Sequence, residues 1–188
     1  MFEAETETTG ANTVSSNVAE IVKRAVNGST TMEAKSLYHP AHPVEIDFPD
    51  FDLRAYFKAQ IYEADEVPTN RIIRIDEDWG IKLDWWLKGR WAECLCGDWC
   101  VQVHFESIGK GLEFNLPMQG NQFIELKPCG DGHYSHDIKV PAGFVKPECC
   151  SSIYKIVASL TYRTPCKRPG PIAGFCELPM VQFYKSKV

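Results

Sequence analysis

The strongest constraint on this chain is an alternation of apolar and polar residues that recurs from Ala55 to Tyr184. Successive side chains of an extended strand point to opposite faces, so a period of two gathers the apolar residues on one face. In residues 79–87, Trp79 and every second residue after it are apolar, whereas the intervening residues include lysine and aspartate. Similar apolar sets begin at Ala55, Trp99, Tyr134 and Tyr154. The alternation therefore predicts a series of strands that each bury one face.

Shorter strand-like segments extend this pattern across the region; they are 71–75, 112–116, 122–126 and 174–184. Strands separated by turns every ~8–12 positions, with no helix between them, are typical of an antiparallel β-sandwich. We predict an all-β sandwich of about seven or eight strands. In strand spacing and alternation, residues 55–184 resemble the immunoglobulin and fibronectin type III group at the level of the fold. That resemblance implies two packed antiparallel sheets and no particular function, because such folds host many unrelated activities.

The first apolar segment, 55–64, fits two kinds of secondary structure. A helix that begins at Asp52 would place Leu53, Tyr56, Phe57 and Ile61 on one side. A strand would instead bury Ala55, Phe57, Ala59 and Ile61. We favour the strand, because every apolar segment that follows has a period of two.

Three regions divide the chain. Residues 1–35 contain few large apolar side chains and many Thr, Glu, Ser and Asn, which predicts a mobile tail. Within the tail, residues 17–27 fit one short amphipathic helix with Val18, Ile21 and Val22 on one face, and this helix could pack on its own domain or dock on a partner. Residues 36–54 contain several prolines and are expected to lie extended along the domain. Residues 55–188 form the predicted sandwich.

Charge and hydropathy narrow the range of partners. The chain has 20 Lys and Arg against 25 Asp and Glu, a net charge of -5, which argues against a nucleic-acid partner. No apolar stretch approaches the ~20 residues of a membrane span. The first residues are acidic, unlike the start of a secretory signal. We therefore expect a cytoplasmic protein.

The 8 cysteines form the most specific group of candidate ligands. The cytosol keeps thiols reduced, so we expect free thiols and no cofactor, with a structural zinc ion as the alternative. An immunoglobulin-like order of strands would bring four cysteines to one end of the sandwich: Cys94, Cys96, Cys129 and Cys166. The Cys94-x-Cys96 spacing differs from the usual C-x₂-C zinc knuckle, and the grouping depends on the predicted topology.

Two other sets of residues are candidates for contact with a partner. Arg163, Lys167 and Arg168 place positive charge in or beside a loop that three prolines stiffen, residues 164–171. Trp86 is predicted to point outward because its neighbour Trp85 takes the buried position. Outward Trp86 and nearby Trp91 could lie under the N-terminal segment through Phe48 and Phe51, or mark an interface.

The sequence contains no signature of catalysis. It has no G-x-S-x-G elbow, no phosphate-binding glycine loop and no H-E-x-x-H motif, so we do not expect an enzyme. We predict a non-catalytic protein-interaction or assembly module that binds a protein partner or itself and is recruited through its N-terminal tail. Recognition would come from the outer face near Trp86 and from the loop around Lys167 and Arg168. The alternative is a zinc-binding or small-ligand-binding sandwich that uses the cysteine-bearing end.

Overall fold

A computed structural model describes residues 40–48, 52–64, 71–117, 122–127, 132–146 and 152–186. All of them belong to one compact unit, Leu37–Val188. The predicted tail and its helix, with Val18, Ile21 and Val22, lie outside the described residues.

The described part is all-β apart from one short 3-10 helix. In chain order the elements are β1 (His42–Ile46), β2 (Arg54–Glu63), β3 (Ile72–Arg74), β4 (Trp79–Lys88), the 3-10 helix η2 (Ala92–Cys94), β5 (Asp98–Ser107), β6 (Phe114–Leu116), β7 (Gln122–Glu125), β8 (His133–Val140), β9 (Ser152–Arg163) and β10 (Pro169–Tyr184).

The ten strands exceed the predicted seven or eight for two reasons. β1 forms inside the proline-containing segment 36–54, where proline excludes a helix but still permits a short strand. In addition, the short segments predicted at 112–116 and 122–126 form two separate strands, β6 and β7, which each pair with β5.

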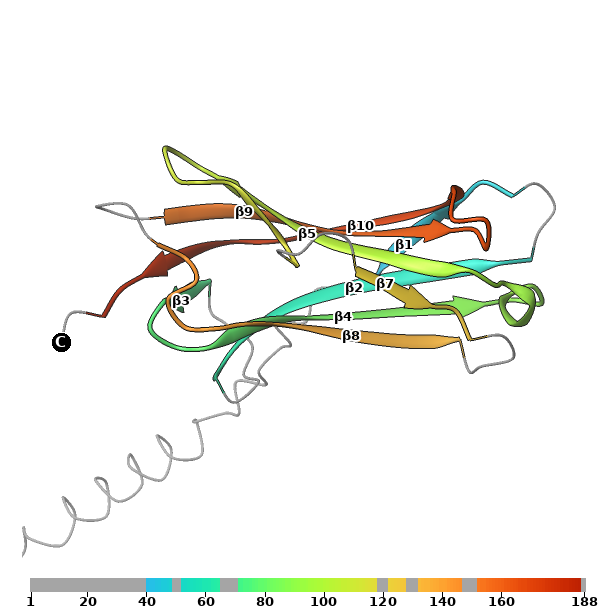
Figure 1. The fold of residues 1–188 in the computed structure, drawn as a ribbon, viewed down its shortest axis with the longest axis horizontal. Coiled ribbons are helices and arrows are strands. Elements are labelled where there is room, and N and C mark those ends of the chain that lie inside the picture. Colours follow the sequence, from blue (N-terminus) through green and yellow to red (C-terminus); the bar gives the residue numbers. More distant parts are fainter. Residues whose placement is uncertain are drawn as a thin grey trace, which may run out of the picture. The chain divides into compact units, whose positions relative to one another are not determined.

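The strands form one mostly antiparallel sheet that bends into a near-barrel. The main path of the sheet is β6-β5-β9-β10-β1-β2-β4-β8; β7 also pairs with β5, and β3 pairs with β10 in parallel. His42, Pro43 and Val44 of β1 pair with β2, whereas the last two residues of β1 pair with β10. β1 therefore connects two layers, which Figure 1 shows as β2, β4 and β8 on one side and β5, β9 and β10 on the other. We call them the β4 layer and the β5 layer.

Aromatic side chains join the two layers across a shared core. Trp85 of β4 meets Trp99 of β5 edge-on, with ring centroids 6.3 Å apart, and both are fully buried. Nearer the other end of the same strands, Trp79 meets Phe105 at 5.8 Å. The inward residues predicted for these strands are buried, as are Phe57 and others on the same face of β2. The strand prediction for 55–64 is confirmed, and the helix alternative is wrong.

The loop from β4 to β5 ends in a glycine that this packing requires. Gly97 has a φ of +128°, a backbone angle that residues other than glycine rarely adopt. Its carbonyl accepts a hydrogen bond from the amide of Leu126 at 2.9 Å. A Cβ at Gly97 would overlap the backbone oxygen of Arg163. The loop can therefore lie against the end of β9 only because this position lacks a side chain.

Alanine substitutions at two glycines separate the loss of stability caused by steric overlap from the loss caused by backbone strain. Gly97→Ala should lower the free energy of unfolding by roughly 3 kcal/mol or more, from strain together with overlap. Gly109→Ala is the matched control, because Gly109 has a φ of +140° but no atom within 4 Å of an added Cβ. It should lose only the strain, roughly 1–2 kcal/mol. Urea denaturation measures both variants, and equal losses would contradict the close approach at Gly97.

Candidate functional site

The outer face of the β4 layer carries a row of three rings. Strand register places Tyr56, Trp86 and His133 side by side on β2, β4 and β8. The Trp86 and His133 rings stack, with centroids 5.0 Å apart and planes 7° from parallel. The Nε2 atom of His133 also lies 3.5 Å from a carboxylate oxygen of Asp84, and the Lys88 ammonium lies 5.9 Å from the Tyr56 ring centroid. Neighbouring side chains therefore hold the row in place.

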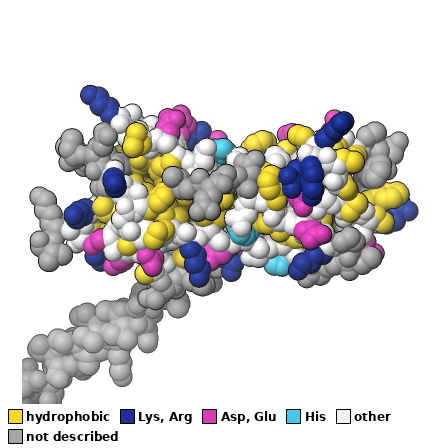
Figure 2. Space-filling model, viewed as in Figure 1, with side chains coloured by type: hydrophobic (Ala, Val, Ile, Leu, Met, Phe, Trp, Pro, Cys, Tyr) yellow, Lys and Arg dark blue, Asp and Glu magenta, His cyan; other side chains and the backbone are white. Residues whose placement is uncertain are grey.

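Positive charge surrounds this aromatic row. Four cationic side chains alternate with buried residues on β2 and β4 and so project from the same face: Arg54, Lys58, Lys82 and Lys88. The carboxylates that project from this face of the described strands are Asp84 and Asp137, and both have partners. Figure 2 shows charges of both signs intermixed on the side of the molecule in view. We call the row and its four cations the cationic aromatic face.

A second cluster lies on the β5 layer, where one carboxylate holds two of the predicted cations. The Oδ2 atom of Asp98 accepts hydrogen bonds from Lys167 Nζ at 2.7 Å and from Arg163 Nη2 at 2.8 Å. The Arg163 guanidinium also lies over the Phe123 ring, 3.4 Å from its centroid. Asp98 is nearly buried. The pairing joins β5, β7 and β9 to the turn that follows β9.

This turn is a closed hairpin, as its prolines suggest. The amide of Thr164 donates to the carbonyl of Arg168 at 2.9 Å, and the amide of Lys167 donates back to the carbonyl of Thr164 at 2.8 Å. Lys167 takes a left-handed φ of +62°. Within the described ranges, Arg168 is exposed and has no ion-pair partner, so it is the most available of the three predicted cations.

Trp86 and Arg163, two of the residues predicted to contact a partner, lie on different layers of the sheet. Trp86 alternates with buried residues of β4 and points outward from the β4 layer. Arg163 follows buried Tyr162 on β9 and points outward from the β5 layer. Because the two layers share one core, these outer faces lie on opposite sides. Sequence spacing could not reveal this, because strand order decides which layer each strand joins.

Trp91 has a different environment from Trp86. It precedes η2, is 43% exposed and lines a cavity of about 60 Å³ together with Phe48, Leu53, Cys94 and Leu95. The predicted approach of the N-terminal segment through Phe48 therefore applies to Trp91. Phe51 lies outside the described residues.

The candidate zinc ligands occupy two neighbouring loops. Cys94 and Cys96 follow β4, and Cys166 lies in the turn between β9 and β10; all three are exposed free thiols. The Tyr162 hydroxyl, near the end of β9, donates to the carbonyl of Cys96 at 2.7 Å and so joins the loop after β4 to the strand that leads into the turn. Cys129 lies outside the described residues. Among the residues that are described, no group of three or more His, Cys, Asp or Glu side chains is arranged to hold a metal.

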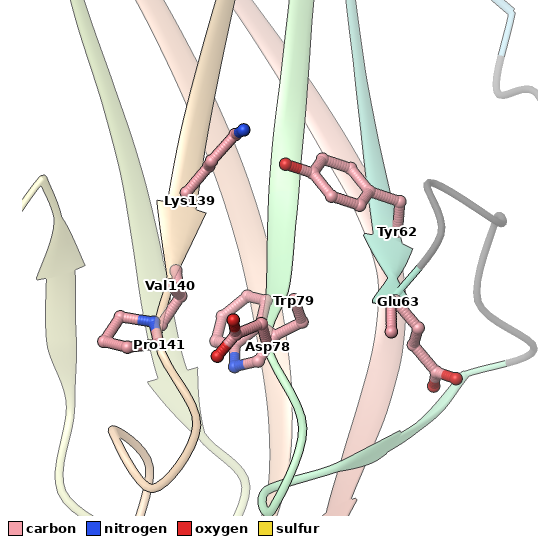
Figure 3. A pocket seen from close by; sticks show the side chains of 8 residues that line it. Tyr62, Glu63, Asp78, Trp79, Lys139, Val140 and Pro141 are labelled. Carbon is pink, nitrogen blue, oxygen red and sulfur yellow. The ribbon is translucent and has the colours of Figure 1, made fainter.

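A cavity of about 440 Å³ opens at the opposite end of the β4 layer. Its lining comes from the ends of β2 and β8 and the start of β4: Tyr62, Glu63, Ala64, Asp78, Trp79, Lys139, Val140 and Pro141. Figure 3 shows Tyr62 and Lys139 pointing toward each other across β4, and Glu63 pointing away. The Tyr62 hydroxyl donates to Asp137 Oδ1 at 2.6 Å, and its ring lies over Gly80, where a Cβ would overlap it. This volume falls in the range of small-ligand sites, ~300–1,000 Å³.

Sequence reasoning missed Asp98, the aromatic partners of Trp86 and this cavity. The sequence did contain a signal for the cationic aromatic face, because the outward positions of 54–62 and 80–88 contain tyrosine, tryptophan and four cations. The cavity had no comparable signal, since its residues meet only through the register of three strands.

No protein-family model matches the chain, and no curated protein matches it. None of the helices in the described ranges is long and apolar enough to cross a membrane.

The Asp98 cluster should make stability depend on pH in the acidic range. Hydrogen bonds from Lys167 and then from Arg163 hold the pKa of Asp98 below its ordinary value of 3.8. A carboxyl whose pKa is lowered by folding contributes stability above the ordinary value, and this is lost as pH falls through the folded value. We therefore expect Asp98→Asn to be less stable than the parent at neutral pH, and the difference to shrink as the solution is acidified below pH 3.8.

Urea midpoints measured across a pH series test this expectation. Glu106→Gln is the control, because Glu106 lies exposed on the same strand. A gap between Asp98→Asn and the parent that persists unchanged at low pH would show that the Asp98 charge does not stabilise the fold.

Proposed function

We propose that the chain is a non-catalytic protein-interaction or assembly module that binds an acidic partner segment on its cationic aromatic face. The observation that carries the proposal is the register of Tyr56, Trp86 and His133 in one row, with four cations beside it. Tryptophan and tyrosine are enriched among the residues that dominate binding energy at protein interfaces. The surrounding cations would steer and orient a partner of opposite charge.

The geometry of the rings favours a protein partner over a single-stranded nucleic acid. Proteins that bind single strands present open ring faces on which bases stack. Here the Trp86 face toward β8 is covered by the His133 ring, because the two lie nearly parallel at 5.0 Å. The stacked pair offers an apolar ridge that fits aliphatic side chains.

The proposal keeps two broader expectations from the sequence. The likeness to immunoglobulin and fibronectin type III folds is supported by two facing layers with mostly antiparallel pairing. A cytoplasmic setting is supported by the free thiols of the five described cysteines. Neither expectation identifies the partner, because function depends on the site and not on the fold.

Binding of defined peptides tests the cationic aromatic face. A short fluorescent peptide of alternating glutamate and leucine should bind the full chain, and its affinity should fall as salt rises. Trp86→Ala should weaken binding by about tenfold or more, which corresponds to ~1.4 kcal/mol. The double variant Lys58→Glu with Lys82→Glu should also weaken it, because these charges would then repel the peptide. Fluorescence anisotropy gives the dissociation constants.

Three controls make this experiment specific. Lys110→Glu changes an exposed lysine in the turn between β5 and β6 and should leave the affinity unchanged. A lysine–leucine peptide should bind far more weakly than the glutamate–leucine peptide. Tighter binding of a single-stranded oligonucleotide than of the acidic peptide, or an unchanged affinity in Trp86→Ala, would overturn the proposal.

The N-terminal tail is proposed to tether this module to its partner or to a larger particle. Deletion of residues 1–36 should leave the thermal unfolding midpoint unchanged, because Leu37–Val188 is a compact unit by itself. Proteins cross-linked to the full chain in cell extract should be lost with the deletion variant. Their retention at equal yield would show that the tail is not the tether.

A structural zinc ion at the cysteine-bearing end is the alternative that we retain. It would draw on Cys94, Cys96 and Cys166, with Cys129 as the fourth ligand. The hydrogen bond from Tyr162 to Cys96 supports this alternative, because it holds the loop of Cys96 against the end of β9, which leads into the turn with Cys166. Small-ligand binding is better supported by the cavity at the opposite end, beside Tyr62 and Lys139.

A further inference from the structure

The strand β8 is a long edge strand. It ends the main path of the sheet and pairs with β4 along its whole length of eight residues (Figure 1). The other strands at or beside the sheet edges, β3, β6 and β7, have three or four residues in the described part of the chain. Short edge strands are one way in which proteins prevent sheets from joining edge to edge. β8 lacks this protection.

β8 is also regular enough to accept another strand. Its pairing with β4 runs through eight successive residue pairs without a shift, whereas the pairing of β10 with β9 is interrupted twice. Bulges and inward-pointing charges also protect edges. Burial lowers the pKa of the inward-facing His136 below its ordinary value of 6.5, which favours an uncharged imidazole at neutral pH. Neither a bulge nor an inward-pointing charge therefore blocks strand pairing at the edge of β8.

The backbone groups that face this free edge follow from the register. Gly132 accepts a hydrogen bond from the amide of Leu87 at 2.8 Å, so it faces β4. In an antiparallel pair the facing direction alternates along the strand. Tyr134, His136 and Ile138 therefore also face β4, whereas the backbone of Asp137 and that of Lys139 point to the open side.

We propose that two copies of this chain associate through their β8 strands, antiparallel, with Ile138 of each copy opposite Ile138 of the other. This register places Asp137 directly opposite Lys139 of the second copy. Because the dimer has two-fold symmetry, the same pair forms a second time with the roles of the two copies exchanged. Both residues present backbone groups to the open side, so each pair forms two backbone hydrogen bonds as well as an ion pair. The β4 layers of the two copies join into one continuous sheet.

Charge complementarity selects this register over its neighbours. A shift that places Asp137 of one copy opposite Asp137 of the other brings two carboxylates together, which is unfavourable in a strand pair. A shift that places Lys139 opposite His133 offers no attraction, because His133 already pairs with Asp84. In the proposed register, Asp137 uses Oδ1 for Tyr62, and its Oδ2 lies 4.0 Å from Lys139 of the same chain. The weakly held Oδ2 atom can therefore accept a bond from the second copy.

A charge swap tests the pairing in the full chain. Lys139→Asp should weaken self-association by about tenfold or more, because it opposes Asp137 of the second copy. The double variant Asp137→Lys with Lys139→Asp restores opposite charges across the interface and should recover most of the affinity. Lys110→Asp makes the same change of charge in the turn between β5 and β6 and should have no effect. Sedimentation equilibrium measures the dissociation constants.

Amide hydrogen exchange provides a second measurement that does not depend on how the variants fold. Raising the concentration of the unmodified chain should slow exchange at the amides of Asp137 and Lys139, which face the open edge. The amides of His136 and Ile138 already bond to β4 and should change little. A chain that stays monomeric at all concentrations, protection without this alternation, or a double variant that fails to recover would overturn the proposal.

This association is separate from the proposed partner site. Trp86→Ala should reduce peptide binding without changing sedimentation, whereas Lys139→Asp should change sedimentation. Failure of one proposal can therefore be distinguished from failure of the other.

Discussion

The contact between the two layers of the sheet is the interaction on which the rest of this structure depends. Trp85 and Trp99 meet across the core, and both are fully buried. Burial of one indole removes ~150–250 Å² from water, a contribution of ~4–6 kcal/mol. Neither indole N–H has a hydrogen-bond partner in the described part of the chain, which costs ~1–3 kcal/mol for each. The gain from burial exceeds this cost, so the two layers stay together.

Because the core uses one face of every long strand, the opposite face remains for other purposes. On the β4 layer that face carries an aromatic row and an excess of positive charge, and the layer ends in β8, whose outer edge pairs with no other described strand. On the β5 layer, Asp98 draws two cations into a cluster that holds the hairpin closed. The two outer faces therefore differ, since one carries a row of rings with cations beside it and the other holds two of its cations on Asp98.

Several features of the fold could be predicted because they depend on neighbouring residues in the sequence. Alternation identified the buried sets of the long strands, such as the one that begins at Trp79. The role of Asp98 was not predictable, because its partners are 65 and 69 positions away. Trp86 was correctly predicted to point outward, but its ring partners come from strands whose register no local pattern specifies.

The sequence by itself determined that this chain forms strands and which side of each strand is buried, because side-chain direction alternates within every strand. Only the tertiary structure decided which strands became neighbours, which layer each joined and which edge stayed open. Those outcomes depend on pairing between distant segments, and this pairing is selected by the packing of the whole core. For that reason Trp86 and Arg163, both predicted to contact a partner, lie on opposite faces of the same domain.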